Sequence, residues 1–307
     1  MGRILVTPRS LTKDGDPALD LLKAAGHEVV FSTPGKQPDE EELLKIVPGC
    51  VGWLAGVEKI TPRVLEAARG LKAISRNGTG VDTVDLDACK RLGIAVLRAE
   101  GANARGVAEL AFALLLALTR SIPFGDAALK AGKWERRQGI ELEGRTLGLV
   151  GCGKIGKMVA RFALAMDMTV LAFDAYPDAS FAPGTGFRFA KLEEVLAQSH
   201  AVSLHCPHKP GDPPLIDGAA LARMKKGAYL VNTARAGLVD SNAVRKALDE
   251  GRLAGYGVDV FDKEPPGPGP LTGHDRVIMS AHVGGYTAER VARATRVAVE
   301  NLLAALG

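Results

Sequence analysis

A glycine motif near the middle of this 307-residue chain constrains its fold more than any other feature. The motif, G-x-G-x-x-G at residues 151–156, follows the apolar run 147–150. We predict a strand over 146–150, a helix over 157–166 and a second strand over 169–173. A strand, a tight glycine turn, a helix and a second parallel strand form a dinucleotide-binding unit, in which the helix N-terminus meets the pyrophosphate.

The residue that follows the second strand selects the cofactor. Asp174 stands 23 positions after the first glycine of the motif. A carboxylate there accepts hydrogen bonds from a free ribose hydroxyl and repels a 2′-phosphate, and residues 175–178 contain no arginine. We therefore predict that the chain binds NAD rather than NADP, with contacts from Gly151, Gly153, Gly156 and Asp174.

The composition is that of a globular protein with two cores. Of the residues, 47% are hydrophobic and 24% are charged, and a chain of this length is expected to fold as two domains. The net charge of +4 is small, and basic residues are interspersed with acidic ones. We therefore expect a small-molecule partner, with no nucleic acid and no membrane. Residues 2–6 predict a first strand rather than a signal peptide, and the longest apolar run, 110–118, is too short to span a bilayer.

The four cysteines, Cys50, Cys89, Cys152 and Cys206, are widely spaced and form no C-x-x-C pair. This spacing predicts reduced thiols and a cytoplasmic location. The segment His-Cys-Pro-His at 205–208 contains side chains that bind zinc, but it lacks a second pair of ligands. We therefore predict no metal site.

Short apolar runs alternate with helical patterns, which predicts an α/β protein with two doubly wound parallel sheets. One set of predicted strands lies upstream of the glycine motif, and the other begins at the motif. The first set covers 4–6, 28–31, 51–55, 71–75 and 94–97. The second set starts at 146–150 and continues with runs near 170, 188, 202, 230, 257 and 278, between helices such as 217–224 and 242–250.

Two helical segments fall outside this alternation. The pattern at 288–306 predicts a helix with no strand after it, and such a helix could pack on the first sheet. The pattern at 102–119 predicts a long helix that could cross from one domain to the other. Both segments therefore suggest that the chain leaves the first domain and later returns to it.

This return defines the predicted domains. A substrate (catalytic) domain, 1–100 and 285–307, contains both chain ends, and an NAD-binding domain, 101–284, is inserted within it. Connections near 98–103 and 283–288 would form a hinge, and we expect the active site in the cleft between the domains.

Three reactive side chains follow predicted strands of the second set, at the edge where ligands bind in open α/β sheets: Arg235, Glu264 and His282. Reduction of a 2-keto acid needs a fixed cation for the carboxylate and a proton donor for the forming alkoxide. The planar guanidinium of Arg235 suits the first task. His282 suits the second, because a neighbouring carboxylate would favour its imidazolium form and fix its orientation.

These segments resemble the D-isomer-specific 2-hydroxyacid dehydrogenase family. The resemblance rests on the glycine motif, on N-T-A-R-A-G-L-V-D at 232–240, on V-D-V-F-x-x-E-P at 258–265 and on A-H-V-G-G at 281–285, and it extends to 77–82 and 107–109. It implies a Rossmann NAD-binding domain inserted into a flavodoxin-like substrate domain, and a homodimer formed through the NAD-binding domain.

The resemblance also assigns roles to residues. It implies that Arg235 binds the substrate, that His282 is the acid/base, and that Glu264 orients and charges this histidine. Backbone N–H groups of the loop after Arg76 would hold the substrate carboxylate. The predicted substrate-binding residues are Arg76, Asn77, Gly78, Thr79, Gly80, Arg235 and His282. Further predicted cofactor contacts are Lys154, Ile155, Cys206, Pro207, Thr233, Ala234, Arg235, Asp259, His282, Gly284 and Gly285, with Asp259 holding the nicotinamide carboxamide.

The identity of the substrate stays open. Residues 76–82 are most similar to phosphoglycerate dehydrogenases, but 53–57 has no basic residue where those enzymes carry a second arginine, and 98–101 departs from their hinge turn. Phosphoglycerate, glycerate with hydroxypyruvate, and glycolate with glyoxylate are the leading candidates. Two other functions also stay open: an NAD(H)-sensing, corepressor-like binding protein, and a formate or phosphite dehydrogenase with the same three residues.

Overall fold

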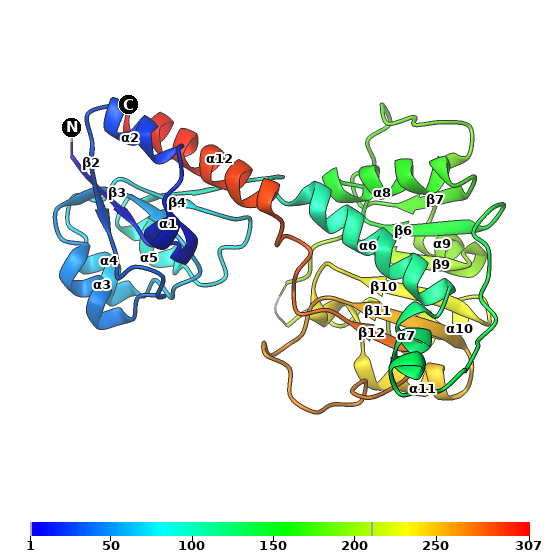
Figure 1. Ribbon diagram of the computed structural model, residues 1–307. Coiled ribbons are helices and arrows are strands. Elements are labelled where there is room, and N and C mark those ends of the chain that lie inside the picture. The colour runs from blue at the N-terminus through cyan, green and yellow to red at the C-terminus, as the bar shows by residue number, and fades with distance from the viewer. Residues whose placement is uncertain (1, 210) are drawn as a thin grey trace. The chain divides into compact units, whose positions relative to one another are not determined.

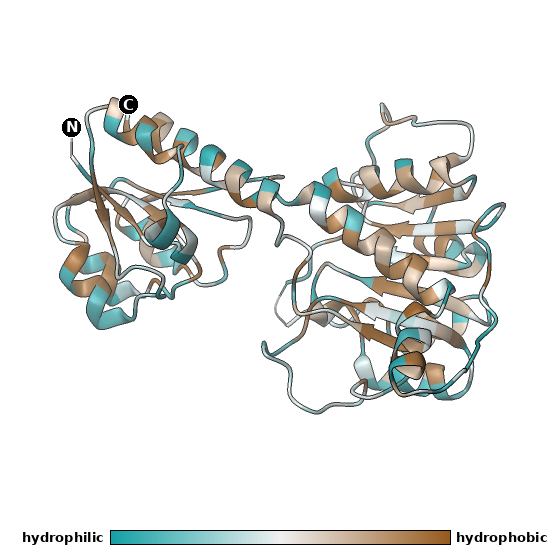
Figure 2. Cartoon of the chain, viewed as in Figure 1, coloured by the Kyte–Doolittle hydropathy of each residue, from teal (hydrophilic) through white to brown (hydrophobic). Residues whose placement is uncertain are grey.

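The computed structural model describes residues 2–209 and 211–307. The chain forms two compact units, one of residues 1–103 and 286–307 and the other of residues 104–285. Each unit is built on one parallel sheet (Figure 1). Apolar residues are concentrated along the strands of both sheets (Figure 2). The predicted class, two doubly wound α/β domains, is confirmed.

The sheet of the first unit has five strands in the order β2-β1-β3-β4-β5. This is the flavodoxin-like order, and all neighbouring strands are parallel. The strands are β1 (Arg3–Val6), β2 (Glu28–Phe31), β3 (Cys50–Ala55), β4 (Ala73–Arg76) and β5 (Ala95–Arg98). One face packs against α3 (Glu40–Ile46), α4 (Pro62–Ala67) and α5 (Leu86–Arg91), and the other against α1 (Arg9–Asp14), α2 (Leu19–Ala24) and α12 (Ala288–Leu306).

Helix α12 brings the end of the described chain back to the first sheet. Ala294, Ala298, Val299 and Leu302 are fully buried and pack in the core beside strands β3 and β4. Their spacing places them on one face of the helix. The predicted helix at 288–306 is confirmed, and it packs against the first sheet.

The sheet of the second unit has seven strands in the order β12-β11-β10-β9-β6-β7-β8. The chain runs outward from β6 to β8 and then returns to the other side of β6, so a topological switch point lies between β6 and β9. This is the Rossmann order with a seventh strand added. The strands are β6 (Thr146–Val150), β7 (Thr169–Phe173), β8 (Phe187–Phe189), β9 (Ala201–Leu204), β10 (Ala228–Asn232), β11 (Leu253–Val258) and β12 (Val277–Met279).

Helices cover both faces of this sheet. One face packs against α6 (Ala104–Thr119) and α8 (Lys154–Ala165), and α7 (Ile122–Lys130) follows α6. The other face packs against α9 (Leu192–Gln198), α10 (Gly218–Arg223) and α11 (Ser241–Asp249), and a 3-10 turn, η1, spans Ala236–Leu238.

The expectation that the helix at 102–119 crosses between the domains is wrong. Helix α6 begins at the first residue of the second unit, and its buried leucines belong to the core of that unit. Leu114 and Leu118 fill the space over Gly255 and Gly257 of β11, where a Cβ would meet their side chains at 2.9 to 3.1 Å. The two glycines therefore let α6 lie close on the sheet.

No single helix in the described parts of the chain is long and apolar enough to cross a membrane. Helices α6 and α7 reach the required length and composition only as a pair, and they are bent by 64°.

Candidate active site

The glycine motif forms the turn between β6 and α8, and each glycine meets a different demand. Gly151 has a φ of 95°, and a Cβ there would lie 2.6 Å from the backbone nitrogen of Cys206. A Cβ at Gly156 would lie 2.2 Å from the carbonyl oxygen of Gly151, so only glycine lets the helix pack on the turn. A Cβ at Gly153 would meet no atom within 4 Å. The turn is therefore open at the position where the backbone approaches a pyrophosphate.

Helix α8 begins at Lys154 and not at 157, which corrects the predicted start. Gly153 precedes the helix in an extended conformation, and Gly156 lies within the first turn because the helix packs closely on the strand there. The N–H groups of Lys154, Ile155 and Gly156 therefore belong to the first turn, which leaves them without intrahelical partners. Such a turn favours a bound anion.

Asp174 lies beside this turn, at the end of β7. Its Oδ2 accepts a hydrogen bond from the Cys152 N–H at 2.7 Å, and its Oδ1 accepts one from the Tyr176 N–H at 2.8 Å. An ionised carboxyl group offers about four lone-pair positions, so acceptor capacity is left for a ribose hydroxyl. The groups predicted to bind the ribose and the pyrophosphate are thus neighbours.

Uncharged polar groups line the adjoining strand ends. Burial, and after it the charge of Asp174, raises the pKa of the Cys152 thiol to about 11, and burial also raises the pKa of Cys206. These thiols are neutral near pH 7 and do not repel a pyrophosphate. The buried hydroxyl of Thr233 has no partner among the described residues and is available to a ligand. The open glycine turn and this hydroxyl fit NAD.

Arg235 stands in a loop that the preceding strand holds in place. Asn232, the buried last residue of β10, donates from Nδ2 to the Arg235 carbonyl at 2.8 Å and accepts at Oδ1 from the Ala234 N–H at 3.0 Å. The exposed guanidinium of Arg235 donates to the carbonyl of Ala234 at 2.8 Å. Its other donors remain available for a carboxylate.

His282 and Glu264 form a hydrogen-bonded pair. Nδ1 of His282 lies 2.8 Å from both carboxylate oxygens of Glu264. Glu264 also accepts a hydrogen bond from the Phe261 N–H at 3.2 Å, which restricts the carboxylate. An acceptor beside Nδ1 keeps the proton on that nitrogen, so the opposite ring nitrogen, Nε2, can exchange a proton with a substrate.

Asp259 anchors the loop that carries His282. The buried carboxylate accepts at Oδ1 from the Ser280 hydroxyl at 2.6 Å and from the Val283 N–H at 2.9 Å, and at Oδ2 from the Gly284 N–H at 2.8 Å. A Cβ at Gly284 would lie 3.0 Å from Oδ2, so the glycine permits this approach. The chain itself uses three of the acceptor positions. The expected contact with a carboxamide therefore stays a prediction, and loop anchoring is the observed role.

The sequence-predicted residues of the second unit share one edge of its sheet. They follow the ends of β6, β7, β9, β10, β11 and β12, and parallel strands end at the same edge. Cys206, Pro207, Thr233, Ala234 and Gly285 lie in these loops with the residues described above, and Lys154 and Ile155 lie in the first turn of α8. Sequence reasoning missed Asn232 and Ser280 as positioning residues. The available signal was a polar side chain at the end of an apolar strand.

The other predicted substrate residues belong to the first unit. Arg76 ends β4 and is only 8% exposed, and Asn77, Gly78, Thr79 and Gly80 form the loop after it. Sequence reasoning missed a neighbour of this loop, because it lies 213 positions away. Arg290, in the first turn of α12, points its guanidinium at the Asn77 carbonyl, 3.5 Å from Nη2.

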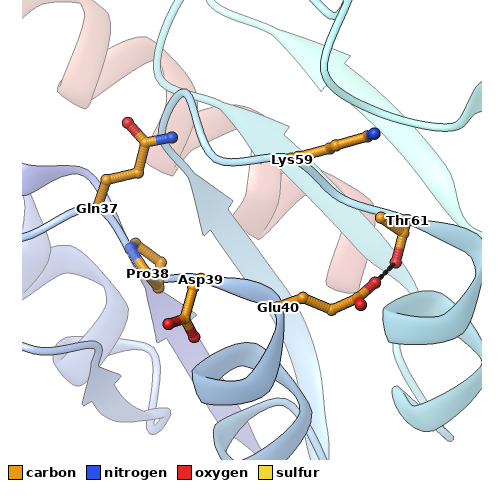
Figure 3. Close-up of a pocket in the computed structure, with 6 residues that line it drawn as sticks. All are labelled: Gln37, Pro38, Asp39, Glu40, Lys59 and Thr61. Carbon is orange, nitrogen blue, oxygen red and sulfur yellow. Dashed lines mark hydrogen bonds between the residues drawn. The ribbon is translucent and has the colours of Figure 1, made fainter.

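A pocket of about 470 Å³ also lies in the first unit, lined by Gln37, Pro38, Asp39, Glu40, Lys59 and Thr61 (Figure 3). Its two carboxylates have partners within the chain. Asp39 caps α3 by accepting from the Glu42 N–H, and Glu40 accepts from the Thr61 hydroxyl. The hydrogen bond from Thr61, and after it the charge of Arg63, lowers the pKa of Glu40. None of the predicted site residues lines this pocket, so pocket size alone does not identify the chemistry.

Residues 112–284 match the family described as D-isomer specific 2-hydroxyacid dehydrogenase, NAD binding domain. A D-3-phosphoglycerate dehydrogenase of Archaeoglobus fulgidus is 36% identical over 292 residues, which are 94% of this chain and 55% of that protein. The chain thus spans about half the length of the curated relatives that it matches.

Two solved structures are similar over nearly the whole chain. The TT0316 protein from Thermus thermophilus is 40% identical, with a TM-score of 0.85 and coverage of 99% of this chain and 96% of that one. A glyoxylate reductase from Paecilomyes thermophila is 25% identical, with a TM-score of 0.86 and coverage of 99% and 95%. NAD, the predicted cofactor, is the one that the matching family domain binds. Its sequence and its fold together place this chain in the D-isomer specific 2-hydroxyacid dehydrogenase family.

Proposed function

We propose that this chain is an NAD-dependent dehydrogenase that interconverts D-2-hydroxy acids and 2-keto acids. The pair formed by His282 and Glu264 carries the proposal, since 2.8 Å separates Nδ1 from each carboxylate oxygen. A histidine oriented by a carboxylate is an acid/base group, and it follows the same sheet edge as the dinucleotide turn. The groups proposed for proton exchange and for hydride exchange therefore lie along the same edge of the second sheet.

Each residue has a defined task in this reaction. NAD supplies or accepts the hydride. Arg235 would hold the substrate carboxylate in its guanidinium fork and polarise the carbonyl. Protonated His282 would give its Nε2 proton to the oxygen during reduction, and neutral His282 would take it back during oxidation. Glu264 would stabilise the imidazolium, and N–H groups of the Gly78–Gly80 loop would add a contact to the carboxylate.

The candidate substrates are phosphohydroxypyruvate, hydroxypyruvate and glyoxylate, with the corresponding D-hydroxy acids. Two relatives support different members of this set, since one is named D-3-phosphoglycerate dehydrogenase and the other glyoxylate reductase. The proposal therefore includes hydroxypyruvate reduction as one of its outcomes.

Loss of NADH absorbance with each keto acid tests the proposal. We expect turnover with at least one of the three, and oxidation of only the D-isomer in the reverse direction. His282→Ala protein, with unchanged NADH affinity, is the control that assigns the turnover to this site. An absence of turnover across the panel, despite tight NADH binding by the wild type, would favour the NAD(H)-sensing alternative.

We also propose that the protein works as a homodimer in the cytoplasm. Ile122, Leu129 and Trp134, in α7 and just after it, are 57%, 58% and 79% exposed, which supports an apolar contact with a second copy. The four cysteines are free thiols, as in a reducing compartment. Light scattering of the wild type and of Trp134→Ser tests the dimer, and a monomeric wild type would contradict it.

A further inference from the structure

We propose that Arg290, together with Arg76, forms a second anion site, which binds a phosphate or carboxylate group carried by the substrate beyond its keto-acid end. The inference rests on the proposed function and names a narrower substrate class, a 2-keto acid with two acidic groups. It assigns specificity to Arg290.

Both guanidiniums converge on one point of the loop after β4. A Cβ placed on Gly78 would lie 3.2 Å from Nη2 of Arg290 and 3.3 Å from Nη1 of Arg76. The absence of a side chain at Gly78 lets both groups approach the loop backbone. Thr287 fixes the start of α12 by accepting a hydrogen bond from the Arg290 N–H at 3.2 Å, so the position of this arginine is set by a capped helix.

The two cations lack the partners that buried charges need. Nε of Arg76 and Nε of Arg290 are buried without a hydrogen-bond partner among the described residues. Burial lowers the pKa of both groups, and the Arg290 charge adds to this effect at Arg76. The charges of Glu58 and Asp82 oppose this effect and raise the pKa of Arg76, and they do so without a hydrogen bond to its guanidinium.

These two carboxylates have other roles or positions. Glu58 is buried and accepts hydrogen bonds from the Thr7 hydroxyl and from the Gly56 N–H. Asp82 is exposed to solvent. A buried charge without a hydrogen-bonded partner is costly, and two like charges side by side increase that cost. A bound oxyanion would relieve both costs through charge-assisted hydrogen bonds.

Two neighbouring arginines of α12 differ from Arg290 because their side chains have partners within the chain. Arg293 donates to the carbonyl of Ala102 at 3.1 Å, and Arg296 pairs with Glu300 at 2.9 Å. Among the described residues, the guanidinium of Arg290 has only the contact of 3.5 Å with the Asn77 carbonyl. Arg290 is also a cation of the first unit, whereas residues 53–57 of that unit contain no basic side chain.

The anion that fits is a second group on the substrate. In the proposed reaction the keto-acid carboxylate is bound by Arg235 and by N–H groups of the Gly78–Gly80 loop. A substrate with one acidic group, such as glyoxylate, brings a single negative charge, which Arg235 already neutralises in this proposal, and provides no second anion for Arg76 and Arg290. A 3-phospho or 3-carboxy group would provide one.

The test compares substrates that differ in this group. Initial rates are measured with phosphohydroxypyruvate, oxaloacetate and hydroxypyruvate for the wild type, Arg290→Ala, Arg290→Lys and the matched control Arg296→Ala. We expect Arg290→Ala to lower kcat/KM for the dianionic substrate relative to hydroxypyruvate by about 10- to 100-fold, mostly through KM. Arg290→Lys should recover part of this ratio, and Arg296→Ala should not change it. The preferred dianion separates phosphate from carboxylate.

A wild type that prefers hydroxypyruvate to both dianions, or a ratio that Arg290→Ala leaves unchanged, overturns the inference while the dehydrogenase proposal stands. A wild type inactive with all three keto acids contradicts the dehydrogenase proposal instead. In that case thermal unfolding with inorganic phosphate still tests the site, because phosphate should raise the Tm of the wild type more than the Tm of Arg290→Ala, which keeps only the glycine turn of the second unit as an anion site. Equal Tm shifts in both proteins overturn the anion site.

Discussion

The two units differ in how the polar groups of the candidate site are partnered. In the second unit three of these groups have partners within the unit: Glu264 with His282, Asp259 with the loop that follows β12, and Asn232 with the loop that carries Arg235. In the first unit the guanidiniums of Arg76 and Arg290 face the same loop position, and the Nε atom of each is buried without a hydrogen-bond partner among the described residues. Under the two proposals above, the second unit is preorganised for chemistry, and the first holds charges that a ligand would neutralise.

This difference separates two kinds of polar residue that the sequence alone does not distinguish, namely those with a partner inside the protein and those without one. Groups that pair within the protein keep a fixed geometry whether or not substrate is present, so their replacement should affect kcat. Groups left unpaired gain their partner only on binding, so their replacement should affect KM and the choice of substrate. The predictions below test this division, from the largest effect to the smallest.

Replacement of His282 by alanine should have the largest effect. Loss of a general acid lowers kcat by about 10²- to 10⁴-fold, equivalent to about 3 to 5 kcal/mol in activation free energy. The affinity for NADH, measured by fluorescence titration, should stay close to that of the wild type. Turnover within about threefold of the wild type would remove His282 from the proton transfer.

Asp259→Ala should destabilise the second unit. The change leaves the Ser280 hydroxyl and the N–H groups of Val283 and Gly284 without their acceptor. Loss of one partner from a buried, charged network costs about 3 to 5 kcal/mol. Urea unfolding measures this cost, and Asp262→Ala, an exposed neighbour, is the matched control. An equal loss in the two variants would contradict the anchoring role.

His205, like Thr233, departs from the pairing seen for Glu264, Asp259 and Asn232 in the second unit. Its ring nitrogens are buried without a partner in the part of the chain that the structure describes, although part of the residue is exposed. Burial lowers the pKa of His205 to about 4, so the ring is neutral at pH 7 and needs no counter-ion. The exception is thus one of hydrogen bonding and not of charge.

The pH dependence of stability follows from this lowered pKa. As the pH falls from 6.5 toward 4, the unfolded chain binds a proton at His205 that the folded chain does not. The free energy of unfolding should therefore fall across this window by about 3 kcal/mol, and His205→Asn should reduce the fall. Urea unfolding across this window measures the effect. An NMR titration of the His205 ring with a midpoint near 6.5 would contradict it.

Asp174→Ala should have the smallest effect. It removes an acceptor for the ribose hydroxyl and the charge that repels a 2′-phosphate, so the preference for NAD over NADP should fall by about tenfold. The ratio of kcat/KM for the two cofactors measures the change, and Asp178→Ala is a control on the following loop. An unchanged ratio would assign the ribose contact to another group.

Local patterns predict most of the fold and only part of the site. The predicted strands 146–150 and 169–173 and the predicted helix 288–306 match their observed bounds because hydrophobic periodicity is a local property. The predicted start of α8 is wrong because the sequence alone does not distinguish a glycine inside the first helical turn, such as Gly156, from a glycine that precedes the helix. The packing of the helix on the strand decides between the two.

The same reasoning explains which site residues could be found. Arg235, Glu264 and His282 each follow a strand, and parallel strands bring such residues to one edge whatever the loops do. Arg290 follows no strand, and its meaning depends on a contact with a loop 213 positions away. No sequence pattern within α12 marks it.

Helix α12 also has a consequence for how the chain is made. Ala294, Ala298, Val299 and Leu302 complete the core of a unit that begins at the N-terminus, so this core stays open until the ribosome has added these residues. The inserted unit is one continuous segment and can close earlier. During synthesis the dinucleotide-binding unit should therefore mature before the first unit, although the first unit is translated first.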